Sequence, residues 1–80
     1  MIKVVLPELT AGTTKATVSY WYSKEGESIR EKDDLVELAT DKATFNLPSP
    51  ATGMVSQIFF KEGDSVQVGE VLGIIEESAS

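Results

Sequence analysis

The sequence predicts an all-β domain: a flattened antiparallel barrel or sandwich of two four-stranded sheets with internal pseudo-twofold symmetry, a barrel-sandwich hybrid. Three observations predict this fold class. The chain contains one supersecondary unit twice, its apolar segments are rich in β-branched and aromatic residues, and no window keeps the 3.6-residue apolar period of a helix. A unit that occurs only twice favours a closed domain over a solenoid.

The repeat becomes visible when the chain is shifted by 37 residues against itself. Identical residues then coincide at Val18-Ser19 with Val55-Ser56, Lys24-Glu25-Gly26 with Lys61-Glu62-Gly63, Ser28 with Ser65, and Leu35 with Leu72. A shorter match sets Leu6-Pro7 against Leu47-Pro48. We therefore expect the same local structure in both halves of the chain.

The elements of the first unit follow from local signals. Residues 17–22 (Thr-Val-Ser-Tyr-Trp-Tyr) have the β-branched and aromatic composition of a strand. The next residues, Lys-Glu-Gly-Glu-Ser, predict a tight turn in which Gly26 supplies a positive φ. A short strand at 28–29 and a second polar turn then lead into a strand at 35–40.

A hairpin is expected next, because the strand at 35–40 and the strand-like segment 44–47 are joined by only two or three residues. Pro48 and Pro50 exclude a helix at that point and mark the end of a strand. The second unit repeats the order, with strands at 54–60, 65–66 and 71–76. Eight short strands in two sets of four are expected in all, of which these seven have assigned ranges.

The core is expected on the inward side of these strands. We expect Trp21, the one tryptophan, to be a core residue rather than a surface on which a ligand stacks. The other core candidates are Ile29, Leu38, Phe45, Leu47, Val55, Ile58, Val66, Leu72 and either Ile74 or Ile75.

Composition excludes several kinds of function. The 80 residues allow one small domain, expected at 1–77, with Ser78-Ala79-Ser80 as the start of a flexible linker to further sequence. The chain has no cysteine and no histidine, which excludes disulfides, zinc-finger sites and Cys or His nucleophiles. A net charge of −6 argues against nucleic acid as a partner, and neither a signal peptide nor a membrane span is predicted.

Lys42 is the candidate for a chemical role. It lies in Thr40-Asp41-Lys42-Ala43, at the tip of the predicted hairpin and near the middle of the duplicated chain. We expect Asp41 to hydrogen-bond the backbone two residues on, and the small Ala43 to leave the amine accessible. A lysine in a turn is usually only a solvated charge, so these residues alone do not assign it a role.

The context of Lys42 extends along the whole chain. It includes the run from Leu35 to Val55, Trp21, the two Lys-Glu-Gly-(Glu/Asp)-Ser turns, and Gly69-Glu70-Val71-Leu72. Together these residues resemble the lipoyl domains of 2-oxo acid dehydrogenase complexes. The resemblance implies a sandwich of two pseudo-twofold-related sheets in which lipoic acid is amide-linked to Lys42, with Asp41 and Ala43 as the flanking recognition turn.

The resemblance also implies a non-catalytic carrier. The chain's own side chains provide no nucleophile–base pair, metal cluster or phosphate loop, so the cofactor, lipoic acid, would supply the reactivity. On Lys42 it would be a swinging arm that carries acyl groups and electrons between the active sites of the complex.

The implied partners are a lipoate-attaching enzyme, a thiamine-diphosphate-dependent 2-oxo acid decarboxylase, an acyltransferase catalytic domain and a dihydrolipoyl dehydrogenase. No nucleic acid and no membrane are expected among them. The implied location is the bacterial cytoplasm or the mitochondrial matrix.

Partner recognition is expected close to the arm. In lipoyl domains, the loop that corresponds to residues 10–14 lies near the swinging arm and helps partner enzymes to choose the domain. Here that loop is threonine-rich instead of acidic. The residues expected to contact partners are Thr10, Ala11, Gly12, Thr13, Thr14 and Glu37.

Two alternatives stay open at this level. A biotinyl carrier domain has the same architecture, but that family presents its lysine between two methionines, whereas Asp41 and Ala43 flank Lys42 here. The alternative of a different class is an unmodified sandwich that only binds proteins. That alternative leaves the intact Thr-Asp-Lys-Ala-Thr turn unexplained.

Overall fold

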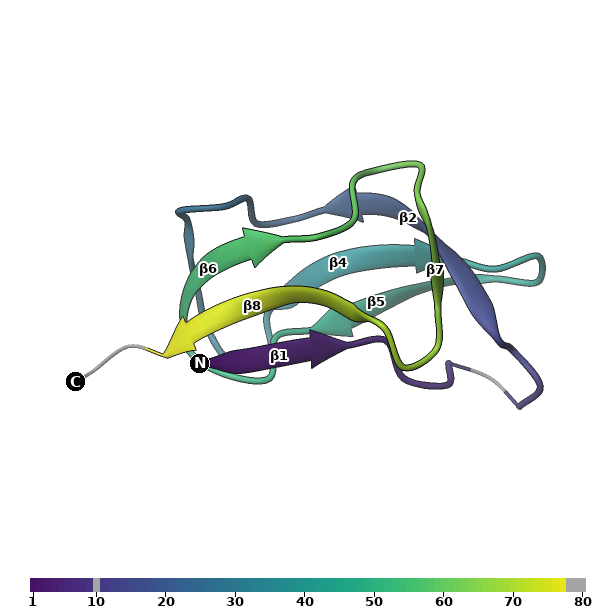
Figure 1. The fold of residues 1–80 in the computed structure, drawn as a ribbon, viewed down its shortest axis with the longest axis horizontal. Coiled ribbons are helices and arrows are strands. Elements are labelled where there is room, and N and C mark those ends of the chain that lie inside the picture. Colours follow the sequence, from purple (N-terminus) through teal and green to yellow (C-terminus); the bar gives the residue numbers. More distant parts are fainter. Residues whose placement is uncertain (10, 78–80) are drawn as a thin grey trace.

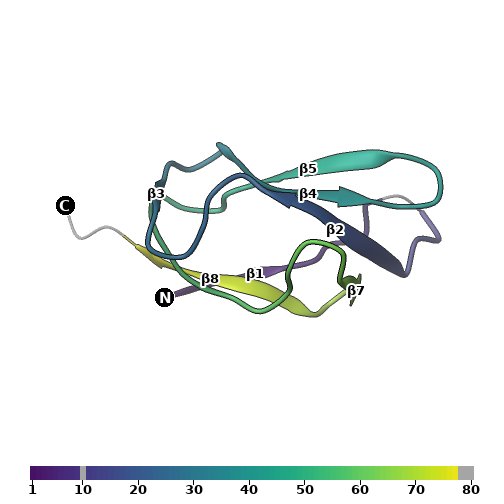
Figure 2. The same cartoon turned by 90° about the horizontal axis from the view of Figure 1, so that it is seen from above.

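A computed structural model describes residues 1–9 and 11–77 of the chain, and within them it contains strands joined by turns. The strands are β1 (Ile2–Val5), β2 (Lys15–Trp21), β3 (Ser28–Ile29), β4 (Asp34–Ala39), β5 (Thr44–Pro48), β6 (Gly53–Ile58), β7 (Ser65–Gln67) and β8 (Val71–Glu77). They form two four-stranded sheets, ordered β1-β8-β6-β3 and β5-β4-β2-β7. The two layers face each other (Figure 2), which confirms the predicted fold class. Within the described part of the chain, no helix is long and apolar enough to cross a membrane.

The two sheets are related by the predicted pseudo-twofold symmetry. Exchanging β1 with β5, β8 with β4, β6 with β2 and β3 with β7 converts one strand order into the other. The turn hydrogen bonds follow the same exchange: the Gly26 amide donates to the Val55 carbonyl at 2.8 Å, and the Gly63 amide donates to the Val18 carbonyl at 2.7 Å. Both glycines have the positive φ that the sequence predicted. The 37-residue repeat is therefore also a repeat in structure. The shorter match of Leu6 with Leu47 is wrong, because Leu6 accepts from the Gly69 amide where Ser49 accepts from the equivalent Lys32 amide.

Bulges explain why apolar residues do not alternate strictly along the longer strands. The register between β2 and β4 shifts between Val18 and Tyr20, and the register between β6 and β8 shifts at the equivalent place, between Val55 and Gln57. One extra residue in the strand reverses the side to which later side chains point. Val18 and Trp21 are therefore both buried although three positions separate them.

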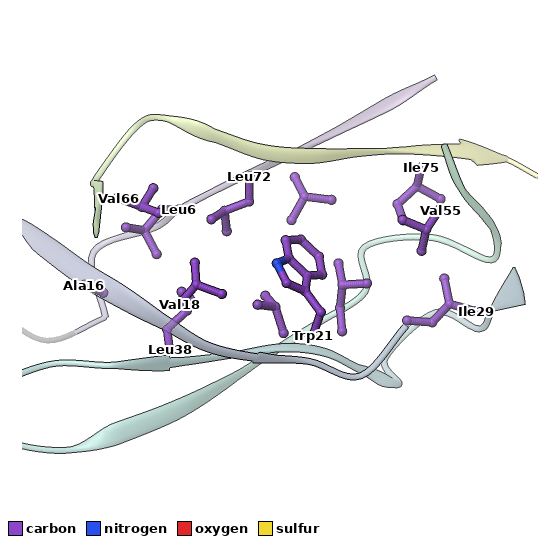
Figure 3. Packing of buried hydrophobic residues seen from close by; sticks show 13 residues of the cluster. Leu6, Ala16, Val18, Trp21, Ile29, Leu38, Val55, Val66, Leu72 and Ile75 are labelled. Atoms are coloured by element: carbon purple, nitrogen blue, oxygen red, sulfur yellow. The ribbon is translucent and has the colours of Figure 1, made fainter. Parts of the chain in front are cut away.

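The core lies between the two sheets (Figure 3), with the Trp21 indole near its centre. The predicted core residues Ile29, Leu38, Val55, Val66 and Leu72 are buried, and Ile75 rather than Ile74 is the buried member of that pair. Leu47 and Ile58 are partly buried and pack against the core. Further buried residues that were not among the predicted core residues are Val4, Leu6, Ala16, Val18, Leu35, Val36, Ser49 and Ala51.

The prediction that Phe45 is a core residue is wrong. Phe45 is only half-buried and does not belong to the core cluster. It is the second residue of β5, an edge strand, and lies close to the β4–β5 turn at one end of the molecule (Figure 1). β5 has a neighbouring strand on one side only, so fewer residues cover its side chains.

Candidate functional site

The β4–β5 hairpin carries Lys42 at one extremity of the molecule. β4 ends at Ala39 and β5 begins at Thr44, so four residues lie between the strands instead of the predicted two or three. The molecule is elongated, 39 × 21 × 18 Å, and the turn lies at the opposite end of its long axis from the start of β1 and the end of β8 (Figure 1). The predicted hairpin is confirmed, and its tip lies far from both the start of β1 and the end of β8.

The turn is closed by Thr40. Its backbone amide donates to the Ala43 carbonyl at 2.8 Å, which leaves Asp41 and Lys42 as the two outermost residues. The Thr40 hydroxyl accepts hydrogen bonds from the Lys42 and Ala43 amides, each at 3.2 Å, and donates to the Ala43 carbonyl at 3.1 Å. Three backbone groups of the tip are thus fixed by one side chain.

This arrangement corrects the role expected for Asp41. Among the described residues, the Asp41 carboxylate accepts no backbone hydrogen bond, and Thr40 stabilises the turn instead. Sequence reasoning missed Thr40, although a threonine at the first position of a turn is a known signal for such a motif. A carboxylate that is not held by the backbone stays solvated beside the lysine.

Lys42 presents an accessible amine. Asp41, Lys42 and Ala43 are all exposed. Within residues 1–9 and 11–77, the Lys42 ammonium forms no ion pair, and no group of three or more His, Cys, Asp or Glu side chains could hold a metal ion. The tip can therefore present a nucleophilic amine, when deprotonated, to an enzyme that approaches from solvent.

A cleft of about 670 Å³ separates the tip from the loop before β2. One wall contains Ala11, Gly12, Thr13 and Thr14, and the other contains residues 39–42. The structure thus brings these four predicted recognition residues next to Lys42, whereas Thr10 lies outside the described residues. Their contact with partners stays a prediction.

Glu37 lies elsewhere, on the outer face of β4. Its carboxylate accepts a hydrogen bond from the Tyr22 hydroxyl at 3.3 Å, and the Asn46 carbonyl oxygen lies 3.2 Å from the same hydroxyl. Partial desolvation of the phenol, followed by the negative charge of Glu37, raises the pKa of Tyr22 above its usual value. The structure does not bring Glu37 together with the loop at 11–14.

Comparison with known proteins adds to this geometry. The model of the biotin/lipoyl family, described as "Biotin-requiring enzyme", matches residues 2–75. A dihydrolipoyllysine-residue succinyltransferase component of the 2-oxoglutarate dehydrogenase complex from Bartonella vinsonii subsp. berkhoffii is 42% identical over 98% of this chain and 19% of its own length. The protein of the same description from Rickettsia conorii is 38% identical over 99% of this chain and 20% of its own length. The chain thus spans about a fifth of these relatives.

Two solved structures share the fold. The lipoyl domain of the 2-oxoglutarate dehydrogenase complex from Azotobacter vinelandii superposes with a TM-score of 0.81 at 30% identity, covering 99% of this chain and all of that one. A single-chain, multi-domain long-chain acyl-CoA carboxylase gives a TM-score of 0.77 at 19% identity, over 98% of this chain and 7% of the carboxylase. The second likeness concerns the fold alone.

Proposed function

The chain belongs to the biotin/lipoyl attachment family, and from that premise we propose that Lys42 is the residue to which lipoic acid is attached through an amide bond. The observation that carries the proposal is the placement of Lys42, an exposed amine on the outermost turn of the long axis. Asp41 and Ala43 are proposed as the flanking residues that the lipoate-attaching enzyme recognises. They are exposed on either side of the amine.

The residues of the tip fit such a group. Amide formation needs an unhindered primary amine, and the small Ala43 side chain leaves the approach to Lys42 open. The Thr40 hydrogen bonds hold the turn, so the amine stays clear of the sandwich. Lipoic acid, when bound, supplies a dithiolane that takes up and releases acyl groups and electrons.

We propose that residues 1–77 are a non-catalytic carrier module of the acyltransferase of a 2-oxo acid dehydrogenase complex. Relatives that carry such a description support this assignment, and 2-oxoglutarate is the oxo acid in their descriptions. The proposed linker at 78–80 lies outside the described residues. Its tether would raise the local concentration of the arm at each active site.

The proposed partners are a lipoate-attaching enzyme, a thiamine-diphosphate-dependent 2-oxo acid decarboxylase, the acyltransferase catalytic domain and dihydrolipoyl dehydrogenase. The proposed recognition loop, residues 11–14, lines the cleft beside Lys42 and would be contacted as the arm enters a partner. The bacterial cytoplasm or the mitochondrial matrix is the proposed location.

Mass spectrometry after co-expression with a lipoate ligase tests the attachment site. We expect one lipoyl increment, on the peptide that contains Lys42, and none in Lys42→Arg. The matched control is Lys24→Arg, which removes an exposed lysine from another turn and should still be lipoylated. An increment on any other lysine, or none on a folded wild-type chain, would contradict the proposal.

A parallel co-expression with a biotin ligase separates the carrier types. We expect no biotin increment, because Lys42 lacks flanking methionines. A biotin increment on Lys42 would assign the chain to carboxylase chemistry. A folded chain that neither ligase modifies would favour an unmodified protein-binding sandwich.

A further inference from the structure

A cluster of polar and aromatic side chains covers the outer face of the sheet that carries the Lys42 hairpin. The tyrosine–carboxylate patch consists of Tyr20, Tyr22, Asp34, Glu37 and Asn46, from β2, β4, β5 and the residue after β2. Two aromatic rings remain in solvent there, since Tyr20 is 47% and Tyr22 is 41% exposed. The rings meet edge to face, with their centroids 5.1 Å apart. The contact holds them as one surface.

The patch has more hydrogen-bond acceptors than donors. The single Tyr22 hydroxyl proton lies within reach of both the Glu37 carboxylate and the Asn46 carbonyl oxygen. The Asn46 amide donates to the Asp34 carboxylate at 3.3 Å. Within the described residues, no lysine or arginine forms an ion pair with Glu37 or Asp34. Carboxylate oxygens therefore remain available for a donor-rich cation.

The fold does not require this cluster. Each patch residue has an equivalent on the other sheet through the pseudo-twofold. The equivalents of Tyr20, Tyr22, Asp34, Glu37 and Asn46 are, in that order, Gln57, Phe59, Val71, Ile74 and Lys3. The equivalent face of the other sheet thus carries no carboxylate at these positions. The same strand pairing is built there with apolar side chains, one neutral amide and one lysine. At these positions, only the face on the hairpin's sheet bears carboxylates and tyrosines.

The patch is also continuous with the arm. β4 leads from Glu37 to the turn, and β5 returns from the turn to Asn46, so both strands join the patch to Lys42. A strand advances about 3.3 Å per residue, which places Glu37 about 10 Å along β4 from Thr40. A protein that covers the patch would therefore also reach the tip.

We propose that the tyrosine–carboxylate patch docks an arginine-bearing surface of the decarboxylase that loads the arm. A guanidinium has five N–H donors in a planar fork and stacks on aromatic rings, so it matches both the surplus acceptors and the exposed tyrosines. The net charge of −6 attracts a basic partner at long range, and the patch fixes where it binds. This inference rests on the proposed function, because it names the partner of the lipoylated domain.

The test measures kcat/KM for reductive acylation of the lipoylated chain by a thiamine-diphosphate-dependent 2-oxoglutarate decarboxylase, at low and high salt. Asp34→Asn/Glu37→Gln should lower kcat/KM roughly fivefold at low salt, and the loss should shrink at high salt as screening weakens the wild-type contact. Tyr22→Ala should lower it about two- to fivefold. The control Phe59→Ala removes the equivalent ring from the other sheet and should stay within about twofold of wild type.

Two readouts keep the outcomes apart. Mass spectrometry of each variant reports lipoylation, which all of them should retain because none alters the turn. A wild-type chain that takes up no lipoyl group would overturn the proposed function and, with it, the named partner. Fully lipoylated patch variants that are acylated as fast as Phe59→Ala would overturn the docking surface alone. Thermal unfolding checks that every variant is folded. If the patch plays no part, kcat/KM of the wild type and of the double variant should change in parallel as the salt concentration rises.

Discussion

Lys32 has a left-handed backbone conformation, which its pseudo-twofold equivalent, Gly69, adopts without strain because glycine has no Cβ. Lys32 has a φ of 77°, and the equivalent Gly69 has a φ of 96°. The Lys32 amide donates to the Ser49 carbonyl and the Gly69 amide donates to the Leu6 carbonyl, each at 2.9 Å, so the two turns have the same hydrogen bond. A side chain in this left-handed region costs about 1–2 kcal/mol, partly offset by the lower chain entropy of unfolded lysine relative to glycine.

Lys32→Gly should therefore raise the free energy of unfolding, by about 0.5–1 kcal/mol. Gly69→Ala should lower it by about 1 kcal/mol or more, because it introduces the same strain at the equivalent turn. Urea denaturation monitored through Trp21 measures both changes. Loss of stability in Lys32→Gly would show that the lysine side chain contributes more than the strain costs.

Tyr22 should make part of the stability of the domain sensitive to alkaline pH. Desolvation, Glu37 and Asp34 raise the pKa of its phenol in the folded state, and the Asn46 hydrogen bond opposes them. The folded phenol therefore keeps its proton at pH values where the unfolded phenol, with a pKa of about 10, has lost it. The contribution is complete below pH 10 or so and is lost as the pH rises through the folded pKa.

Glu37→Gln should lower the pKa of Tyr22 toward its ordinary value. The reason is that the substitution removes the negative charge that disfavours the phenolate. Ultraviolet absorbance of the phenolate, compared with Tyr22→Phe to isolate the one residue, measures the shift. A Tyr22 titration curve that does not change in Glu37→Gln would mean that Glu37 does not contribute to the raised pKa.

At the scale of elements, the β4–β5 turn depends on the Thr40 hydroxyl. This group contacts the Lys42 amide, the Ala43 amide and the Ala43 carbonyl. Thr40→Val keeps the shape of the side chain but removes all three hydrogen bonds, and an exposed set of this kind contributes about 1 kcal/mol. We expect faster hydrogen exchange at the Ala43 amide and slower lipoylation of Lys42.

Thr40→Ser is the matched control, because it keeps the hydroxyl and loses only a methyl group. It should exchange and be lipoylated nearly as wild type does. If Thr40→Val and Thr40→Ser behave alike, the backbone hydrogen bond from Thr40 to Ala43 suffices to hold the turn.

The elements were largely predictable from sequence because they depend on local chemistry. β-branched and aromatic runs predicted β2 and β6 to within two residues at either end, and Pro48 does end β5. The hairpin and its lysine followed from the same signals. The burial of both Leu35 and Val36 could not be predicted in this way. It depends on the register shift between β4 and β5, which no local sequence pattern indicates. The same holds for the Tyr22–Glu37 contact, which joins the residue after β2 to a residue of β4.

At the scale of the whole molecule, the two ends of the sandwich are equivalent in architecture but not in chemistry. A second cleft, of about 560 Å³, lies at the other end, lined by residues such as Thr52, Gly53 and Glu76. These correspond to Lys15, Ala16 and Ala39 of the cleft beside the tip. Only the first cleft has a hairpin turn beside it among the described residues. The two ends are thus similar in architecture, and one of them carries Lys42.

The core breaks the same symmetry, and Gly73 is where this is most evident. Trp21 corresponds to Ile58, and Gly73 corresponds to Val36. The large Trp21 side chain of one sheet therefore faces Gly73, which has no side chain, in the other. A Cβ on Gly73 would lie 2.6 Å from the Gln57 carbonyl oxygen and 3.5 Å from the Trp21 ring. The indole donates to the Phe60 carbonyl at 2.8 Å, so it cannot retreat without losing that hydrogen bond.

Gly73→Ala should therefore lower the free energy of unfolding by about 2–3 kcal/mol, since it forces β6 and β8 apart and displaces the indole. Urea denaturation measures the loss, and hydrogen exchange should accelerate along β8. The control Val36→Ala, at the equivalent position, removes buried methyl groups without a backbone clash. It should cost stability as a cavity does, and exchange in β8 should accelerate no more than the lower global stability requires. If Gly73→Ala left both stability and β8 exchange as in wild type, the close approach of the two strands would not be what requires a glycine.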